Sequence, residues 1–208
     1  MLANRPESQD SNFMWADLAE KNNNELLKNI GNFSARILKF IEGHYAKVIP
    51  EFVADDPTSV TNAEICLKEI YAEFINYVTA MEAVKIKEAL KIAMGISNLC
   101  NKYMQDWKPW ETSKTNPKFA ASAVNVLVNV FILLCAIMEP FIPTFSAKVY
   151  AMMNWKRGER EETLLGYICD SKDYKKILTI LPPKHTIGEI FPIFRESTVY
   201  ILISINSH

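Results

Sequence analysis

Two polar side chains that could recognise a nucleic-acid base, Asn32 and Arg36, lie four residues apart near the start of the chain. Residues at this spacing are neighbours on one face of a helix. An amide and a guanidinium both offer planar donors in a fixed geometry, which suits the hydrogen-bonding edge of a base. On a wheel of about 100° per residue, both cluster with Lys28 and Lys39, roughly 135° from the apolar face. Taken alone, the pair fits an ordinary exposed Asn and Arg equally well.

A second candidate is the segment Trp107-Lys108-Pro109-Trp110. Tryptophan side chains in a charged loop are costly to leave exposed unless they pack or bind. An aromatic ring fixed by proline beside lysines suits the stacking of an unpaired base, which is worth about 1–3 kcal/mol. We expect Trp107 to cover the core and Trp110 to remain available for stacking.

The charge of the chain is uneven along its length. The 208 residues contain 23 Lys and Arg against 24 Asp and Glu, so the net charge of −1 alone indicates no nucleic-acid partner. Basic residues nevertheless exceed acidic ones over residues 28–48 and 84–118. These windows predict a surface that faces phosphates, with Lys28, Lys39 and Lys108 as possible contacts. Ordinary solvated helix faces are the alternative.

Catalytic and metal-binding motifs are absent from the sequence. It has no Gly-rich phosphate loop, no Gly-x-Ser-x-Gly and no His-Glu-x-x-His. The acidic pairs 55–56 and 161–162 are expected in loops, where solvated charge explains them. No Cys-x-x-Cys occurs, which indicates free, mostly buried thiols in a reducing compartment and predicts no metal site. The cysteines are Cys66, Cys100, Cys135 and Cys169, and the scattered histidines are His44, His185 and His208.

The elements that must position these residues are helices. Apolar residues recur every three or four positions, which predicts helices over 22–50, after Asp56-Pro57, over about 83–106, from Pro117 to 139 and over 144–154. The fold class is therefore all-α, a bundle of about five helices with a partly irregular C-terminal tail, in which 197–205 is β-rich.

The same pattern predicts where the helices begin and end and which residues they bury. Asn22 with Glu25, and Thr61 with Glu64, have the spacing of N-terminal caps, and Pro50 should end the first helix. The residues expected to face inward are Leu26, Ile30, Phe33, Ile37, Ile41, Tyr45 and Val48 on the first helix, Ile65, Ile70, Phe74 and Val78 on the second, and Ile86, Leu90, Ile92, Met94 and Leu99 on the third.

The segment from Ala120 to Met138 carries no charge over 19 residues, close to the length that spans a membrane. It contains Asn125 and Asn129, and a lone membrane anchor would more often carry flanking basic residues and aromatic belts. A buried central helix is the favoured interpretation. A membrane span, or a scaffold protein that uses 120–138 as a partner face, is the alternative. The N-terminus lacks the apolar run of a signal peptide.

Several stretches together resemble methionyl-tRNA synthetase, most closely its eukaryotic type. They are residues 5–15 (RPESQDSNFMW), 21–36 (KNNNELLKNIGNFSAR), 101–110 (NKYMQDWKPW), 139–143 (EPFIP) and 181–188 (LPPKHTIG). Their order and spacing match the C-terminal anticodon-binding domain of that family. The resemblance covers roughly residues 5–195.

The resemblance implies a site and a role. In the family an Asn-x-x-x-Arg and the Trp of a Pro-Trp loop recognise the first anticodon base, a cytosine, and these positions fall on Asn32, Arg36 and Trp110. This chain has Ala35 where the family often has Asn. The implied partners are the anticodon loop of methionine tRNA and the catalytic domain of the same enzyme, without a membrane. The anticodon-binding helical domain of another class I synthetase is the nearest alternative.

The resemblance also implies what lies outside the chain. The full ligase uses ATP and magnesium to join methionine to tRNA, yet the sequence contains neither His-Ile-Gly-His nor Lys-Met-Ser-Lys-Ser. We therefore expect the chain alone to be catalytically inactive and to need no cofactor. The expected division is a connector over 1–20, the helical anticodon-binding domain over 21–190 and a tail over 191–208, and the expected location is the cytoplasm.

Overall fold

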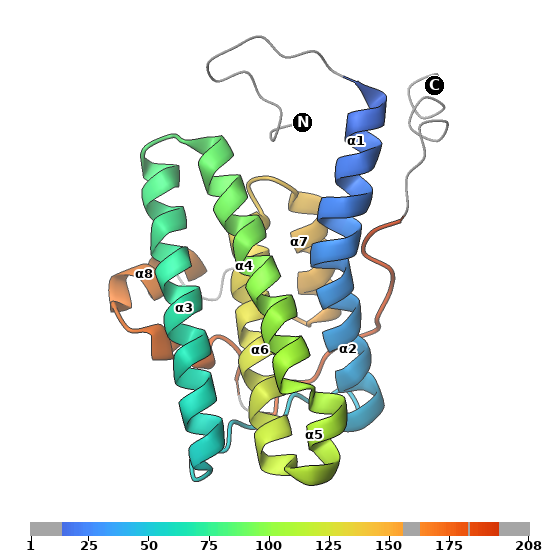
Figure 1. Ribbon diagram of the computed structural model, residues 1–208, viewed down its shortest axis with the longest axis vertical. Coiled ribbons are helices and arrows are strands. Elements are labelled where there is room, and N and C mark those ends of the chain that lie inside the picture. The colour runs from blue at the N-terminus through green and yellow to red at the C-terminus, as the bar shows by residue number, and fades with distance from the viewer. Residues whose placement is uncertain (1–13, 156–162, 183, 196–208) are drawn as a thin grey trace.

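The computed structural model describes residues 14–155, 163–182 and 184–195. In this part of the chain the fold is a helical bundle without a β-sheet, which confirms the predicted all-α class (Figure 1). An isolated antiparallel bridge joins Val48 to Thr186. Figure 1 shows α4 (Ile86–Trp107) between α3 (Pro57–Glu82) on one side and α2 (Asn32–Tyr45) on the other, with α6 (Pro117–Met138) behind it. The helix α6 contacts these three helices as well as α5 (Pro109–Thr115) and α7 (Pro143–Met152), and is therefore the central member.

The first helical rod starts earlier than the sequence predicts. It consists of α1 (Trp15–Lys21), the π-helical segment η2 (Asn22–Gly31) and α2 (Asn32–Tyr45). The rod is continuous because Asn22 and Asn32 both have right-handed helical backbone angles. The prediction that Asn22 caps a helix was therefore wrong: Asn22 lies inside the rod, and the expected connector over 1–20 already contains helix from Trp15.

The rod ends before the proline that was expected to stop it. Ala46, with φ 48°, and Lys47, with φ 66°, are left-handed, so the helix terminates at Tyr45 and Val48 is no longer part of it. Instead, the chain pairs with a late segment: Ile49 N–H donates to the His185 carbonyl at 2.8 Å, and Ile187 N–H to the Lys47 carbonyl at 2.8 Å. The prediction that this face points inward is confirmed for four residues that are fully buried: Ile30, Phe33, Ile37 and Ile41.

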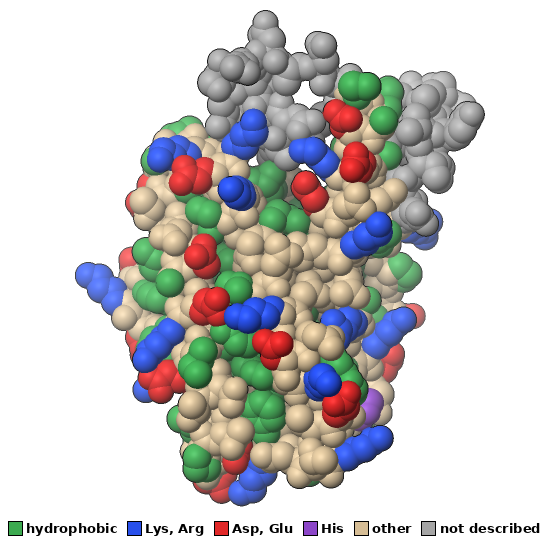
Figure 2. Space-filling view, in the orientation of Figure 1, with side chains coloured by type: hydrophobic (Ala, Val, Ile, Leu, Met, Phe, Trp, Pro, Cys, Tyr) green, Lys and Arg blue, Asp and Glu red, His purple; other side chains and the backbone are tan. Residues whose placement is uncertain are grey.

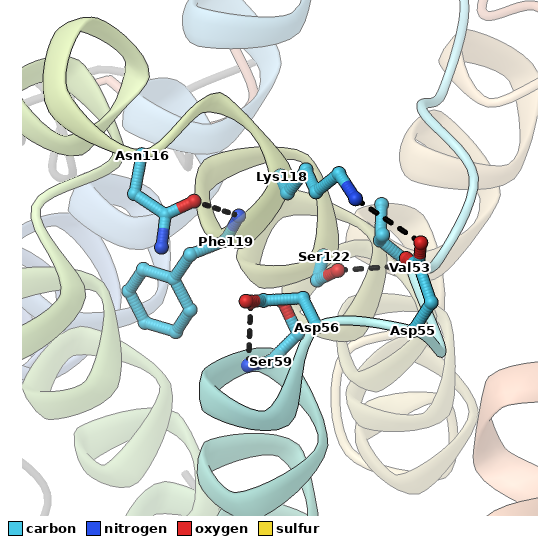
Figure 3. Close-up of polar contacts among 8 residues, drawn as sticks. All are labelled: Val53, Asp55, Asp56, Ser59, Asn116, Lys118, Phe119 and Ser122. Carbon is cyan, nitrogen blue, oxygen red and sulfur yellow. Dashed lines mark hydrogen bonds and ion pairs between the residues drawn. The ribbon is translucent and has the colours of Figure 1, made fainter.

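The helix α3 (Pro57–Glu82) is capped by Asp56 rather than by the predicted Thr61–Glu64 box. The Asp56 carboxylate accepts from the Ser59 N–H at 2.8 Å and from the Ser59 hydroxyl (Figure 3). The pKa of the Asp56 carboxyl is lowered, and the hydrogen bond from the Ser59 hydroxyl is the largest cause. Thr61 lies in the second turn because Pro57 already suits the first helical position, so the helix begins five residues before the start that a cap at Thr61 would give.

The inward faces of α3 and of α4 (Ile86–Trp107) differ in part from the prediction. On α3, Ile70 and Phe74 are fully buried, but Ile65 is 57% exposed. On α4, the residues predicted to face inward are only half-buried. The face that packs on α3 and α6 is made instead of Ala89, Ala93, Ile96, Ser97, Cys100, Tyr103, Met104 and Trp107. Small residues at the contact allow two helices to approach closely.

A short helix, α5 (Pro109–Thr115), fills the break predicted after Trp107 and was not expected. The next helix, α6 (Pro117–Met138), starts as predicted, with Pro117 in its first turn. The Asn116 side chain caps it by accepting from the Phe119 N–H at 3.1 Å (Figure 3). At the same end Lys118 lies 3.1 Å from the Asp55 carboxylate, which ties α6 to the segment before α3.

The apolar run of α6 forms the centre of the core. This helix is long and apolar enough to cross a membrane, but 89% of its most apolar stretch is buried inside the bundle. Its polar residues hold loops in place: Ser122 accepts from Val53 N–H at 2.9 Å, and Asn125 donates to the Pro50 carbonyl at 2.8 Å. Asn129 accepts from Leu181 N–H at 2.9 Å. The burial favours the central-helix interpretation over the membrane or scaffold alternative.

The C-terminal part is more ordered than expected. After α7 (Pro143–Met152), the chain forms α8 (Leu164–Ser171) and the 3₁₀ segment η3 (Tyr174–Thr179), where little helix was predicted. The stretch up to residue 195 packs on α7, with the rings of Phe194 and Phe145 stacked 5.4 Å apart. The β-rich stretch 197–205 lies outside the described residues, as does the polar stretch 156–162.

The four cysteines fit the prediction of free thiols. Cys66, Cys100 and Cys135 are buried and Cys169 is half-buried, and none is in a disulfide. Burial raises the pKa of the Cys66, Cys100 and Cys135 thiols. These three therefore remain protonated and act as small apolar core residues.

Candidate nucleic-acid interface

The helix α2 presents Asn32 and Arg36 on the face turned away from the core. Asn32 is exposed and Arg36 is half-buried, whereas Phe33 and Ile37, which directly follow them in the sequence, are fully buried. The wheel prediction is thus confirmed for this part of the rod. The neighbouring Ala35, where the resembling family often has Asn, is exposed and carries no polar group.

Trp110 lies against the same site from a different element. The guanidinium carbon of Arg36 is 4.9 Å from the centroid of the Trp110 ring, a cation–π contact. One amino group of Arg36 also donates to Gln105 Oε1 at 3.2 Å. The guanidinium is therefore held between Gln105 on α4 and Trp110 on α5.

The corner between α4 and α5 places Trp110 there. Lys108 has left-handed angles, φ 42° and ψ 62°, so the chain reverses sharply between the two helices, and Pro109 fixes the first turn of α5. Trp107 anchors the corner in the core: it is 6% exposed and packs edge-on against Phe119 at 6.0 Å. Trp110 is half-buried, resting on the core without being enclosed by it. The prediction that Trp107 covers the core while Trp110 remains accessible is confirmed by the burial of the two side chains.

Asn32 belongs to a chain of side-chain amides between the rod and α4. Asn32 Nδ2 donates to Asn101 Oδ1 at 3.0 Å. Asn101 Nδ2 donates in turn to the carbonyls of Asn29, at 3.1 Å, and Ser97, at 3.1 Å, and to Asn29 Oδ1 at 3.0 Å. The polar pair Asn32 and Arg36 on α2 thus faces a second polar pair, Asn101 and Gln105, on α4.

The lysines around the site do not form the single basic surface that the two basic sequence windows predict. Figure 2 shows basic and acidic side chains interspersed over the face that α2 and α4 share, without a continuous basic patch. Lys108 pairs with Glu111 at 3.3 Å, and Lys28 donates to Asn24 Oδ1 at 2.9 Å. Lys39 is exposed and has no ion pair within the described residues. Of the three predicted phosphate contacts, Lys39 is the most readily available.

Sequence reasoning missed Asn101 and Gln105. Both lie inside the stretch 101–110, and their spacing of four residues repeats the spacing of Asn32 and Arg36. That repeat was the only available signal, because the contacts between the pairs bridge 69 positions of the chain. Within the described residues, no group of three or more His, Cys, Asp or Glu is arranged to hold a metal ion.

Comparison with known protein families gives two matches that together cover most of the chain. Residues 53–188 match the family model described as the anticodon-binding domain of methionyl tRNA ligase. The chain belongs to this family. Residues 1–38 match a second model, class I tRNA synthetases of the methionine type. The match to a methionyl family decides against the anticodon-binding domain of a different class I synthetase.

Full-length relatives agree with the assignment to methionyl-tRNA ligases. The cytoplasmic methionine–tRNA ligase of Arabidopsis thaliana is 37% identical over 206 residues, covering 94% of this chain and 24% of the relative. The human cytoplasmic methionine–tRNA ligase is 32% identical over 199 residues, covering 94% of this chain and 20% of the relative. The chain spans about a quarter or less of the length of these relatives.

The fold agrees with solved structures of the same family. The crystal structure of the free form of Mycobacterium tuberculosis methionyl-tRNA synthetase superposes with a TM-score of 0.75 at 14% identity. The superposition covers 95% of this chain and 37% of that one. The bundle is therefore the methionyl-tRNA synthetase type of helical anticodon-binding fold.

Proposed function

We propose that this methionyl-tRNA ligase domain recognises the first anticodon base of methionine tRNA, a cytosine, through Asn32, Arg36 and Trp110. The observation that carries the proposal is the contact of the Arg36 guanidinium with the Trp110 ring, at 4.9 Å, beside an exposed Asn32 on the same helix face. An aromatic face and two planar polar groups meet at one place that solvent can reach. This is the set of groups that recognises an unpaired base by stacking and by hydrogen bonds to its edge.

Each residue has a separate part in the proposal. Trp110 supplies a stacking surface that accepts any base. Arg36 is always a donor and suits the two acceptors of cytosine, N3 and O2. Asn32 retains a carbonyl oxygen that suits the cytosine amino group. A uracil in the same place would oppose a donor to Arg36 and an acceptor to Asn32, leaving desolvated groups unpaired.

The remainder of the ligase reaction is assigned to residues outside this chain. We propose that the full protein is a cytoplasmic methionine–tRNA ligase, as the names of the relatives suggest. We also propose that it uses ATP and magnesium, which the sequence resemblance to that family implies. This chain carries neither of the ATP-binding motifs of class I synthetases, so the steps that consume ATP belong to the catalytic domain. We propose 1–20 as a connector to that domain, 21–190 as the tRNA-binding bundle and 191–208 as a tail.

The test is a binding titration with anticodon stem-loop RNAs. The chain is titrated against the stem-loop of methionine tRNA and against three versions in which only the first anticodon base differs. Cytosine should bind roughly 5- to 150-fold more tightly than the other bases, which corresponds to about 1–3 kcal/mol per wrong base. Equal affinity for all four RNAs would contradict the proposal.

Lys39 should contribute to binding without affecting the choice of base. Replacing Lys39 by alanine is expected to weaken binding to all four RNAs by a similar factor and to reduce the salt dependence of the affinity by about one phosphate contact. The measurement is the titration repeated at two salt concentrations. Lys175→Ala on η3, on the side of the bundle away from α2, is the matched control and should leave both values unchanged (Figure 1). If the Lys39 variant kept the salt dependence of the wild type, Lys39 would not be a phosphate contact of the interface.

A further inference from the structure

The chain of amides beside the site has only one orientation that satisfies its hydrogen bonds. A carbonyl oxygen can only accept, so the backbone carbonyls at its inner end determine which atom of each amide faces them. Asn29 Nδ2 points to the Met94 carbonyl at 3.4 Å, which leaves Asn29 Oδ1 to accept from the Ser97 hydroxyl at 2.9 Å.

The same argument fixes Asn101. Its side chain faces the carbonyls of Asn29 and Ser97, both at 3.1 Å, so the group between them must be the NH₂. Asn101 Oδ1 is therefore turned outward, toward Asn32. Asn101 is half-buried and, with its three acceptors, cannot reverse without opposing oxygen to oxygen.

The orientation of Asn101 determines that of the Asn32 side-chain amide. Because an oxygen of Asn101 faces it, Asn32 must present Nδ2 at 3.0 Å, and its own Oδ1 is the atom left free to face a ligand. Asn32 Oδ1 has no hydrogen-bond partner among the described residues. Without Asn101, the exposed amide could turn about its last torsion and offer either its oxygen or its NH₂, because that torsion is broad and roughly two-fold.

We propose that Asn101 is a positioning residue that sets the preference for cytosine over uracil by holding Asn32 Oδ1 outward. The inference rests on the proposed function of the site. At the 4-position, cytosine presents an amino group and uracil presents an oxygen. An oxygen of Asn32 held outward accepts from the amino group and opposes the uracil oxygen. A freely turning amide would serve both bases.

This mechanism has a signature that a purely structural role lacks. Replacing Asn101 by alanine should weaken binding of the cytosine stem-loop and leave binding of the uracil stem-loop unchanged or slightly stronger. The cytosine-to-uracil ratio of affinities should fall about three- to tenfold, the range expected for one hydrogen bond. General loosening of the site would weaken both RNAs together and preserve the ratio.

Two further variants keep the test independent of folding. In Asn101→Ser the hydroxyl can still donate to the Ser97 carbonyl of the preceding turn but is too short to hold Asn32, so the ratio should fall as in the alanine variant. Ser97→Ala removes the hydroxyl bonded to Asn29 but keeps the carbonyl that holds Asn101. It should lower the melting temperature and leave the ratio at the wild-type value.

The decisive experiment compares the wild type, Asn101→Ala, Asn101→Ser and Ser97→Ala on three stem-loops, whose first anticodon base is cytosine, uracil or 2-pyrimidinone, which lacks the 4-amino group. The wild type should lose affinity when the amino group is removed, and both Asn101 variants should lose little. If the wild type prefers cytosine and the folded Asn101 variants keep its full ratio, this inference is overturned and the proposed function stands. If the wild type shows no preference, the proposed function itself fails.

Discussion

Alanine in place of Leu133 or Leu134 is expected to lower the free energy of unfolding by about 2–5 kcal/mol, as is typical of a cavity left by a large core side chain. Both side chains are fully buried on α6. This helix is surrounded by the other helices of the bundle, so adjacent residues that point in different directions are both enclosed. Chemical denaturation of each variant measures the loss.

The control is the same type of truncation at a position on the surface. Ile65 on α3 is 57% exposed, so Ile65→Ala should change the free energy of unfolding by no more than about 0.5 kcal/mol. If the Leu133 and Leu134 variants were as stable as the Ile65 variant, α6 would not be the centre of the bundle.

Removal of the Trp110 ring should cause the largest loss of RNA binding by a single residue. Stacking on an aromatic side chain is worth about 1–3 kcal/mol, so Trp110→Ala should weaken binding to stem-loops of every first base by a similar factor, roughly 5- to 150-fold. Trp110→Phe keeps an aromatic face and should retain much of the affinity. Titrations with the cytosine and uracil stem-loops measure both variants.

Trp110 also rests on the core, so its variants need a check on folding. The melting temperature supplies it, and Trp107→Phe in the same corner is the matched control. Trp107 is 6% exposed and should affect stability far more than base contact. A folded Trp110→Ala variant that binds RNA as tightly as the wild type would show that no base stacks there.

Features of the fold that depend on local chemistry could be predicted from the sequence. The uncharged run of α6 and its start at Pro117 were visible because a proline at the first turn and an apolar stretch both act within a few residues. The predicted cap at Thr61 was wrong for the same local reason, since Asp56-Pro57 offers an equivalent start five residues earlier.

Features that depend on which helices approach one another could not be predicted. On α4, large residues such as Leu90 and Ile92 were expected inside, yet Ala89 and Ala93 are the residues with no exposure. Hydrophobic periodicity gives weight to large side chains, whereas a close helix contact selects small ones. The start of the first rod at Trp15 was missed because no side chain caps it.

The candidate site likewise has one part that could be predicted from the sequence and one part that could not. Asn32 and Arg36 share a helix face, so their proximity follows from spacing alone. The contact of Arg36 with Trp110 and the bond from Asn32 to Asn101 join the rod to α5 and α4, at separations of about 70 positions. Such contacts become visible only once the packing of the bundle is known.

The measurement that tests the central claim most directly is a cycle that crosses Arg36→Ala with the change of the first anticodon base from cytosine to uracil. Four affinities, from two proteins and two stem-loops, give the coupling energy between the side chain and the base. If Arg36 recognises the base, the coupling should be about 1–3 kcal/mol, because the variant loses the preference for cytosine as well as affinity. A variant that binds more weakly yet keeps the full cytosine preference would give a coupling near zero, and would contradict the assignment of base recognition to Arg36.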